Sequence, residues 1–462
     1  MVRESSSSDP LALLIYPPVY DFALYDLFLK PFGLLRVGNL LRASGYRVRV
    51  INALDYTDEE TVRVLGKPKR KSDGTGKLFR QIAEKPGVLK RGALSSLKRN
   101  FARYGVLSGV IEGKIREERP DIILVSSGMT YWYLGVKEVV EMCRRIYPRV
   151  PIVLGGVYAT LCEKHARNNL DVDFIVVGNA RPELDRILEI LKLPGLNDVI
   201  TPLVAGIPLE PLLEEKIFRD AAVVMLNTGC PFRCRYCASF RMYDRFLKGN
   251  PNHTLTFIKK VHSSLGTRNF AFYDDALLFR REEVFLPFIK MVVEEELNLN
   301  FYLPNGIHLS YLDETVARLM FKAGFRDVRI GLESSSDAFH SREDRKLDIH
   351  EFGRGIEILK SVGFTGAQIG VYILAGLPGQ YREEVEETIR FVSPYGVRIY
   401  VAEYSPVPGT PMFEDSVRFS SFPIEEEPLL HNNTILPLQW EHFSFEDLSY
   451  LKGLARELSI KR

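Results

Sequence analysis

The sequence predicts an α/β protein that begins with a doubly wound, Rossmann-like parallel sheet, continues as a partial (β/α)6 barrel and ends in a helical carboxyl-terminal tail. Two observations predict this fold class. Apolar runs rich in β-branched residues alternate with amphipathic stretches along most of the chain, as in βαβ units. The length of 462 residues allows about three domains of roughly 150 residues each. We expect these domains at residues 1–200, 201–412 and 413–462.

Five apolar runs in the first 200 residues predict the strands of the doubly wound sheet. Amphipathic stretches such as GVKEVVEMCRRI separate these runs and predict helices that cover the sheet. The ligand crevice of such a sheet lies at the carboxyl ends of its strands. The runs are LALLIYPP, YRVRVIN, DIILVSSG, PIVLGGV and DFIVVGN.

A locally basic insertion at residues 55–108 separates the second run from the third, and the doubly wound fold does not require it. Its GTGK segment fails the phosphate-loop pattern, because Lys71 stands where the first glycine should be and Leu78 follows the lysine. A basic stretch is usually a solvated surface and less often binds an anionic partner. Because the whole chain carries 61 basic and 59 acidic residues, we predict no nucleic-acid binding.

Six later runs predict the parallel strands of the barrel. Stretches such as ETVARLMFKAG lie between them, with apolar residues at three- and four-residue spacing. The active site of a β/α barrel lies at the carboxyl ends of its strands. The runs are AAVVMLNTG, RNFAFYDDALL, LNFYLPNGIHL, DVRIGLES, GAQIGVYILAG and RIYVAEYSP.

The segment CPFRCRYC, residues 230–237, holds three of the five cysteines and directly follows the first barrel run. The odd cysteine count and the polar start MVRESSSSDP predict a cytoplasmic protein with reduced thiols and no transmembrane segment. A closed zinc site is disfavoured, because it takes four ligands and no second CxxC or HxxxH pair appears. Cys143 and Cys162 are predicted to be ordinary packed thiols.

The spacing of the three cysteines favours iron chemistry. Cys234 and Cys237 lie three residues apart, so one tight turn brings both sulfurs to one side, while Pro231 keeps the segment after Cys230 in a loop. Iron–sulfur clusters are normally held by four thiolates, so a loop with three indicates a 4Fe-4S cluster with one open iron. An open iron is a position at which a substrate can bind.

CxxxCxxC with Tyr236 before the last cysteine, at the end of a first strand, resembles the signature of the radical S-adenosylmethionine (SAM) superfamily. The resemblance implies that Cys230, Cys234 and Cys237 bind the cluster and that SAM chelates the open iron. It also implies that an electron from the cluster cleaves SAM to a 5′-deoxyadenosyl radical. An external donor such as flavodoxin or ferredoxin would supply that electron.

The same resemblance implies SAM contacts at other strand ends, and Tyr236 is expected beside the adenine. Glu333 closes the fourth barrel run and is one of the expected SAM contacts. Alternatively, it is only an exposed carboxylate at the strand end. Asp274 follows the second run and could instead cap the next loop. Gly376 lies in LAGLPGQ, before a helix expected near Tyr381. Its backbone could approach SAM closely, or the glycine could simply form a tight turn, and the two alternatives are equal.

The amino-terminal region resembles the cobalamin-binding domain of cobalamin-dependent radical SAM enzymes. The loops after its strands match those that hold the nucleotide tail of the cofactor in that family. The resemblance therefore implies a set of cobalamin contacts in these loops. They are Ser126, Tyr131, Gly155, Gly156, Thr160 and Gly178.

One element of the cobalamin pattern is missing. Many such domains carry DxHxxG after the first strand, whose histidine ligates cobalt, but no histidine precedes His165. The match DIHEFG at residues 348–353 lies in the barrel region, where His350 is expected beside a helix start. Either cobalamin binds without a histidine and rests on the apolar surface of Tyr131 and Trp132, or the domain binds no cobalamin.

We therefore expect an enzyme that transfers a methyl group to an unactivated carbon with SAM, a 4Fe-4S cluster and cobalamin. The alternatives are a radical cyclisation or rearrangement without methyl transfer, and a non-catalytic iron–sulfur or corrinoid carrier. A carrier would normally complete its cluster with a fourth cysteine. The sequence assigns no catalytic residue, and the substrate, whether a small molecule or a peptide, stays open.

Overall fold

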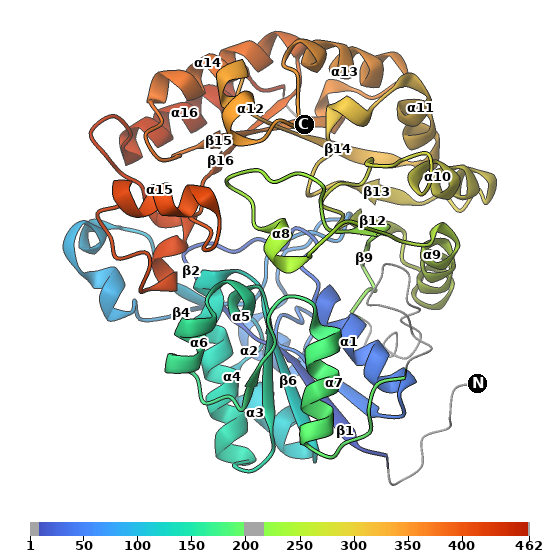
Figure 1. Cartoon of the computed structure of the whole chain (residues 1–462), viewed down its shortest axis with the longest axis vertical. Coiled ribbons are helices and arrows are strands. Elements are labelled where there is room, and N and C mark those ends of the chain that lie inside the picture. Colours follow the sequence, from blue (N-terminus) through green and yellow to red (C-terminus); the bar gives the residue numbers. More distant parts are fainter. Residues whose placement is uncertain (1–8, 198–216, 461–462) are drawn as a thin grey trace. The chain divides into compact units, whose positions relative to one another are not determined.

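The computed structural model describes residues 9–197 and 217–460. The chain divides into two compact units (Figure 1). The described part of the first consists of residues 9–197, 217–219 and 426–430, and that of the second of residues 220–425 and 431–460. The expected boundary at residue 200 lies outside the described residues. The tail that was expected as a separate domain from residue 413 is shared between the two units.

The first unit contains the predicted doubly wound sheet, with five parallel strands in the order β3-β1-β6-β7-β8. Every residue of β1 is buried, as expected of a strand covered on both faces. The order reverses between β1 and β6, the place where such sheets bind ligands. The strands are β1 (Leu11–Tyr16), β3 (Arg47–Asn52), β6 (Ile122–Ser127), β7 (Ile152–Gly156) and β8 (Phe174–Ile175).

The helices of the first unit follow these strands in the predicted alternation. The amphipathic stretch GVKEVVEMCRRI forms most of α4, whose apolar side chains are buried. The helices are α1 (Phe32–Ala43), α3 (Ser108–Glu117), α4 (Tyr133–Ile146), α5 (Val157–Leu161), α6 (Glu163–Asn169) and α7 (Ala180–Ile190).

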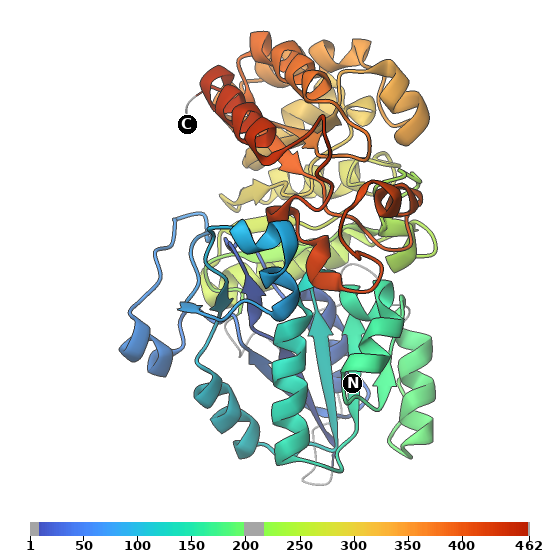
Figure 2. The ribbon, with the colours of Figure 1, turned by 90° about the vertical axis from the view of Figure 1, so that its left-hand side faces the viewer.

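The basic insertion contains secondary structure of its own. Its strand β5 pairs antiparallel with both β2 and β4, which gives the order β2-β5-β4 beside the main sheet (Figure 2). It also holds the helix α2 and two short 3₁₀ turns. The elements are β2 (Val19–Asp21), α2 (Glu59–Leu65), β4 (Arg80–Ile82), η1 (Gly87–Lys90), η2 (Gly92–Ser96) and β5 (Ala102–Tyr104).

The second unit contains the predicted six parallel strands, which form one open sheet in the order β16-β15-β14-β13-β12-β9. Phe272, Phe301 and Phe325 come from three neighbouring strands and pack with ring centroids 5.2 to 5.8 Å apart. The strands are β9 (Ala222–Val224), β12 (Asn269–Phe272), β13 (Asn300–Tyr302), β14 (Phe325–Glu333), β15 (Ile369–Ala375) and β16 (Arg398–Glu403).

Helices follow one another around the outside of this sheet (Figure 1). No helix within residues 9–197 and 217–460 is long and apolar enough to cross a membrane. The helices are α8 (Ser239–Met242), α9 (Pro251–Leu265), α10 (Phe285–Glu294), α11 (Glu314–Ala323), α12 (Asp337–Glu343), α13 (His350–Ser361), α14 (Arg382–Val392), α15 (Pro411–Phe419) and α16 (Phe445–Leu458).

Candidate functional site

The three-cysteine loop begins directly after the carboxyl end of β9 and the short strand β10 (Asn227–Thr228). Gly229 opens it with φ of 76°, and a Cβ there would lie 2.7 Å from the carbonyl oxygen of Arg245, so only glycine fits. The amide of Cys237 donates to the carbonyl of Cys234 at 3.1 Å, which closes the tight turn expected from their spacing. Cys234 is buried, Cys230 half-buried and Cys237 exposed.

The donor chemistry of this loop fits a 4Fe-4S cluster better than a single metal ion. Among the described residues, no three His, Cys, Asp or Glu side chains converge closely enough to hold one ion. In a cluster each thiolate binds a different iron, so the sulfurs need not meet at one point. Burial raises the pKa of Cys230 to about 11 and that of Cys234 to about 12. These thiols therefore need a bound cation to ionise at neutral pH.

A buried polar network fixes the loop aromatic Tyr236. Its hydroxyl donates to Asp344 Oδ2 at 2.8 Å. The other oxygen of Asp344 bonds His340 Nδ1 at 2.9 Å, and His340 Nε2 lies 2.8 Å from the carbonyl oxygen of Ser334. The ammonium of Lys346 lies 5.5 Å from the centre of the Tyr236 ring. Tyr236 is therefore held by residues that follow β14, and its contact with the adenine stays a prediction.

Glu333 ends β14 in an unusual backbone conformation. Its φ is 66°, a left-handed value that costs a non-glycine residue energy, and the pairing of β14 with β15 shifts by one residue there. Lys346 Nζ binds Glu333 Oε1 at 2.7 Å. A Cβ on Gly331 would lie 2.7 Å from the same carboxylate oxygen, so this glycine leaves room for the ion pair. The carboxylate predicted to contact SAM is thus held in place by a buried lysine.

Lys346 was not identified from the sequence. Burial alone would lower the pKa of its ammonium, but the carboxylates of Glu333 and Asp344 outweigh that effect and keep the pKa raised. The signal for this residue was the run EDRK at residues 343–346, three of whose four charged side chains are buried. Charged residues are almost never buried unless paired, so such a run, here at the carboxyl end of α12, indicates a polar site only once its burial is known.

The two aspartates after β12 have different surroundings. Asp274 is 2% exposed, and its carboxylate accepts hydrogen bonds from the amides of Leu226 and Asn227 at 2.7 to 3.1 Å. It therefore fixes the chain between β9 and the cysteine loop, which disfavours the predicted SAM contact. Asp275 accepts a hydrogen bond from Ser239 Oγ at 2.6 Å and is more exposed. The sequence could not tell which of the two adjacent side chains turns inward.

The turn at Gly376 is occupied by a side chain of the same loop. Gly376 has φ of 83°, and its amide donates to Gln380 Oε1 at 2.8 Å. Gln380 also binds the amide of Leu377 at 3.2 Å. The Gly376 amide is therefore not available to SAM, and a contact there would have to use the Cα face. Helix α14 begins at Arg382, as expected.

The glycine pair of the first unit lies at the carboxyl end of β7, where Ser126 pairs with Gly155 and Ser127 with Gly156. Gly156 has φ of 97°, and a Cβ there would lie 2.4 Å from the carbonyl oxygen of Ser127. A Cβ on Gly155 would meet nothing within 4 Å. The backbone at Gly155 therefore borders open space, into which a ligand could fit closely.

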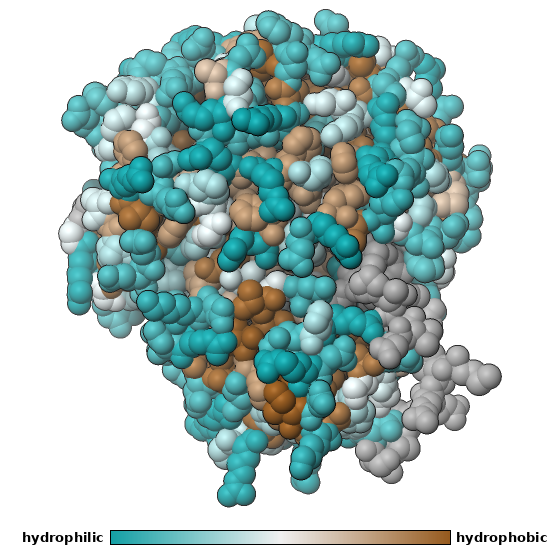
Figure 3. Space-filling model, in the orientation of Figure 1, coloured by the Kyte–Doolittle hydropathy of each residue, from teal (hydrophilic) through white to brown (hydrophobic). Residues whose placement is uncertain are grey.

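Thr160 links two loops of this crevice. Its hydroxyl donates to the carbonyl of Gly156 at 2.9 Å and accepts from the amide of Gly178 at 3.0 Å. At the same edge of the sheet, Met129 is 48% and Val177 41% exposed, and Figure 3 shows apolar surface over this part of the unit. Open space beside the glycine backbone, with apolar side chains exposed at the same edge of the sheet, fits the nucleotide tail of cobalamin.

The aromatic pair after β6 is only partly available to a ligand. Tyr131 is 7% exposed, whereas Trp132 is half-buried and donates from Nε1 to Asp21 Oδ2 at 2.8 Å. His165 lies 2.7 Å from the hydroxyl of Tyr158 through Nδ1. His350 is exposed at the first position of α13 in the other unit, as expected. Trp132 is thus a better predicted surface for the corrin than Tyr131.

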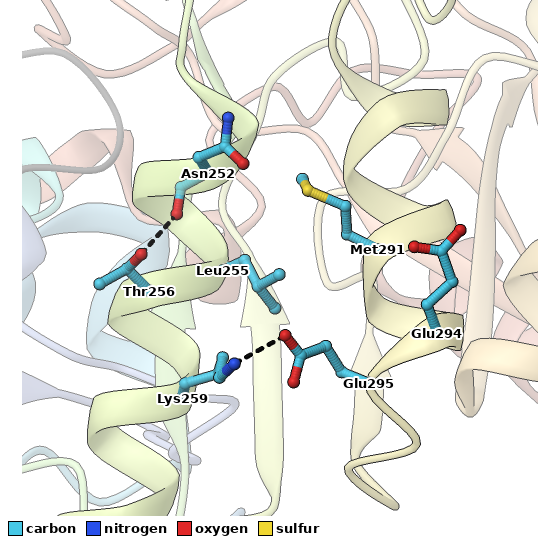
Figure 4. Close-up of a pocket in the computed structure, with 7 residues that line it drawn as sticks. All are labelled: Asn252, Leu255, Thr256, Lys259, Met291, Glu294 and Glu295. Atoms are coloured by element: carbon cyan, nitrogen blue, oxygen red, sulfur yellow. Dashed lines mark hydrogen bonds and ion pairs between the residues drawn. The ribbon is translucent and has the colours of Figure 1, made fainter.

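A groove of about 490 Å³ between α9 and α10 offers no comparable chemistry. Its Lys259 is paired with Glu295 at 2.6 Å, and Thr256 Oγ1 donates to the carbonyl of Asn252 at 2.8 Å (Figure 4). The groove is therefore a space between two barrel helices. Its lining residues are Asn252, Leu255, Thr256, Lys259, Met291, Glu294 and Glu295.

Family models match one segment in each of the two units. The Radical SAM superfamily profile matches residues 224–392, and the B12 binding domain profile matches residues 108–188. The first match contains the cysteine loop and the Glu333–Lys346 pair. The second contains the glycine crevice at β7.

Three similar proteins illustrate the relationship. The uncharacterized methyltransferase PH0819 of Pyrococcus horikoshii is 24% identical over 72% of this chain and 74% of its own length. The anaerobic magnesium-protoporphyrin IX monomethyl ester cyclase of Cereibacter sphaeroides is 21% identical over 65% of this chain and 54% of its own. The radical SAM methyltransferase TsrM from Kitasatospora setae was solved with cobalamin and a [4Fe-4S] cluster bound. Its structure shares the fold of this chain with a TM-score of 0.64 and a sequence identity of 14%. The match covers 90% of this chain and 80% of TsrM.

Proposed function

We propose that the protein is a cobalamin-dependent radical SAM methyltransferase acting on an unactivated carbon, because residues 224–392 match the Radical SAM superfamily and residues 108–188 match the B12 binding domain. The observation that carries the proposal is the three-cysteine loop at the carboxyl end of β9, in a chain that also presents the open glycine crevice at β7. When bound, the cluster would supply the electron that cleaves SAM, and cobalamin would supply the methyl group.

The residues of the second unit hold and orient these groups. Cys230, Cys234 and Cys237 would bind three irons and leave the fourth to SAM. Lys346 fixes the direction of the Glu333 carboxylate, which is thereby ready to accept hydrogen bonds from the SAM ribose or methionyl amine. An external one-electron donor is required, since none of these side chains stores a low-potential electron.

In the first unit, the backbone at Gly155 and the link through Thr160 would shape the channel for the nucleotide tail of cobalamin. No histidine in residues 9–164 can ligate the cobalt, because the sequence has none before His165. Trp132 would instead offer the corrin a flat apolar surface.

The proposal is tested with anaerobically purified protein, SAM and a chemical reductant. We expect both 5′-deoxyadenosine and S-adenosylhomocysteine, the product left when SAM gives up its methyl group. A cyclase, the function named for the Cereibacter relative, would release 5′-deoxyadenosine alone. A protein that binds iron and corrinoid but releases neither product would be a carrier, and the proposed enzyme activity would be wrong.

The two crevice glycines give a matched pair of variants. Gly155→Val fills open space and touches no protein atom within 4 Å at its Cβ, so we expect a normal melting temperature and a loss of cobalamin binding. Gly156→Ala forces a left-handed φ and a contact of 2.4 Å, and is expected to cost about 1–3 kcal/mol of folding free energy. Thermal unfolding and corrinoid absorbance measure the two effects. Undiminished cobalamin binding by Gly155→Val would show that the tail lies elsewhere.

A further inference from the structure

The basic insertion displays a hairpin whose role the proposed enzyme activity does not explain. Residues 67–77, named the lysine hairpin, are joined by hydrogen bonds from Lys77 N to Lys69 O at 2.9 Å and from Lys71 N to Thr75 O at 2.8 Å. Lys69 therefore stands directly opposite Lys77 across the hairpin. Like charges in directly opposite positions destabilise paired strands. The arrangement is costly to the protein alone.

The hairpin lysines are exposed and take part in no ion pair that the described residues form. Lys67, Lys69, Lys71 and Lys77 are all exposed, and no ion pair within the described residues involves them. The carboxylate Asp73 is used inside the turn, where it accepts from the amide and the hydroxyl of Thr75 at 2.8 and 2.6 Å. Four positive charges thus face solvent without a paired carboxylate among the described residues.

An inward-pointing arginine anchors the hairpin to the rest of the first unit. Arg70 turns inward, pairs with Asp26 at 2.7 Å and stacks 3.8 Å from the centre of the Tyr56 ring. A Cβ on Gly76 would lie 2.6 Å from the carbonyl oxygen of Lys69, so the strands approach as closely as glycine permits. Because Arg70, whose side chain is 9% exposed, anchors the turn, the lysines are displayed on an ordered support rather than on a loose loop.

Apolar side chains border the lysines. Val64 and Leu65 end α2, two residues before Lys67, and are 65% and 39% exposed. Tyr25 is 44% exposed, and the ammonium of Lys71 lies 5.5 Å from the centre of its ring. Exposed aliphatic residues beside lysines, with a tyrosine at the margin, are typical of surfaces that rest on a membrane.

We propose that the lysine hairpin, with Val64 and Leu65, docks the protein on an anionic phospholipid surface. The lysines would lie against the headgroups, while the two aliphatic side chains enter the boundary of the acyl region. Nucleic acid fits less well, because aliphatic side chains cannot stack on bases and arginine is the usual residue for bidentate phosphate contacts. This inference does not depend on the proposed reaction, and its test needs no cofactor.

The test is co-sedimentation of the full-length protein with vesicles of phosphatidylcholine alone or mixed with phosphatidylglycerol. We expect binding to the anionic vesicles, weakened by salt. One lysine near such a surface contributes about a fivefold change in affinity, so Lys69→Gln with Lys77→Gln should weaken binding about 25-fold. Val64→Ser with Leu65→Ser should remove the part of the binding that survives high salt.

The matched control is Lys290→Gln with Lys322→Gln, which removes two exposed lysines from the other unit and should leave binding unchanged. Equal binding of the hairpin variant and the native protein overturns the proposal, and so does equal binding to neutral vesicles. A transfer RNA that binds more tightly than the anionic vesicles, with the same loss in the hairpin variant, would assign the hairpin to nucleic acid instead. Unchanged melting temperatures are expected for the serine variant and for the control, because the replaced side chains are exposed. The hairpin variant should melt at the same or a slightly higher temperature, because the repulsion between Lys69 and Lys77 is removed.

Discussion

Cys234→Ala is expected to abolish cluster binding and, with it, all cleavage of SAM. Cys234 is the most deeply buried of the three loop thiols and its carbonyl closes the turn to Cys237, so a neighbouring water cannot easily replace the lost ligand. Iron and sulfide analysis after anaerobic reconstitution, together with visible absorption, measures the effect. Release of 5′-deoxyadenosine should fall to background in the same samples.

Cys143→Ala provides the control, since Cys143 is fully buried in α4 of the other unit, where it packs like a small apolar residue. Its replacement should leave the iron content unchanged. Cys162→Ala is a second control with the same expectation. Full iron occupancy in the Cys234→Ala protein would mean that the three-cysteine loop is not the cluster site.

The second large effect is expected for Lys346→Met. Lys346 is 8% exposed and its ammonium neutralises Glu333 at 2.7 Å and faces Asp344 at 3.9 Å. Removing one partner of a buried pair leaves an uncompensated charge and costs about 3–5 kcal/mol. We therefore expect a lower free energy of unfolding in urea and weaker SAM binding, because Glu333 loses the contact that sets its direction.

A double variant separates these two effects. Glu333→Gln with Lys346→Met removes both charges, so it should recover much of the lost stability while SAM binding stays weak. Lys248→Met is the matched control, because its pair with Glu283 is exposed and should contribute little. If Lys346→Met unfolds like the native protein, the lysine does not neutralise Glu333 in solution.

The fold could be predicted from the sequence because its signals are local. Strands such as β1 and β15 are short, nearly continuous apolar runs, and buried parallel strands have this pattern. The cysteine loop could be predicted for the same reason, since its spacing within eight residues already contains the turn that Cys234 and Cys237 form. Each of these features depends on neighbours in the sequence.

The rest of the site depends on contacts between distant residues. Tyr236 meets Asp344 across 108 positions in the chain, and no local pattern specifies that hydrogen bond. The insertion was predicted as a basic segment, but its small sheet pairs residues 19–21 with residues 102–104. At Asp274 and Asp275 the strand has already ended, so alternation no longer tells which side chain turns inward.

The division of the chain has a consequence for the order in which the protein is made. Residues 426–430 complete the first unit, where Leu429 and Leu430 are buried and Glu427 accepts from the Tyr133 hydroxyl at 3.4 Å across 294 positions. On the ribosome, most of this unit emerges long before that closing segment exists. It must then wait, with apolar surface open, while the whole barrel is synthesised. Chaperone dependence and aggregation of nascent chains are therefore expected to centre on the amino-terminal unit, although its sequence is translated first.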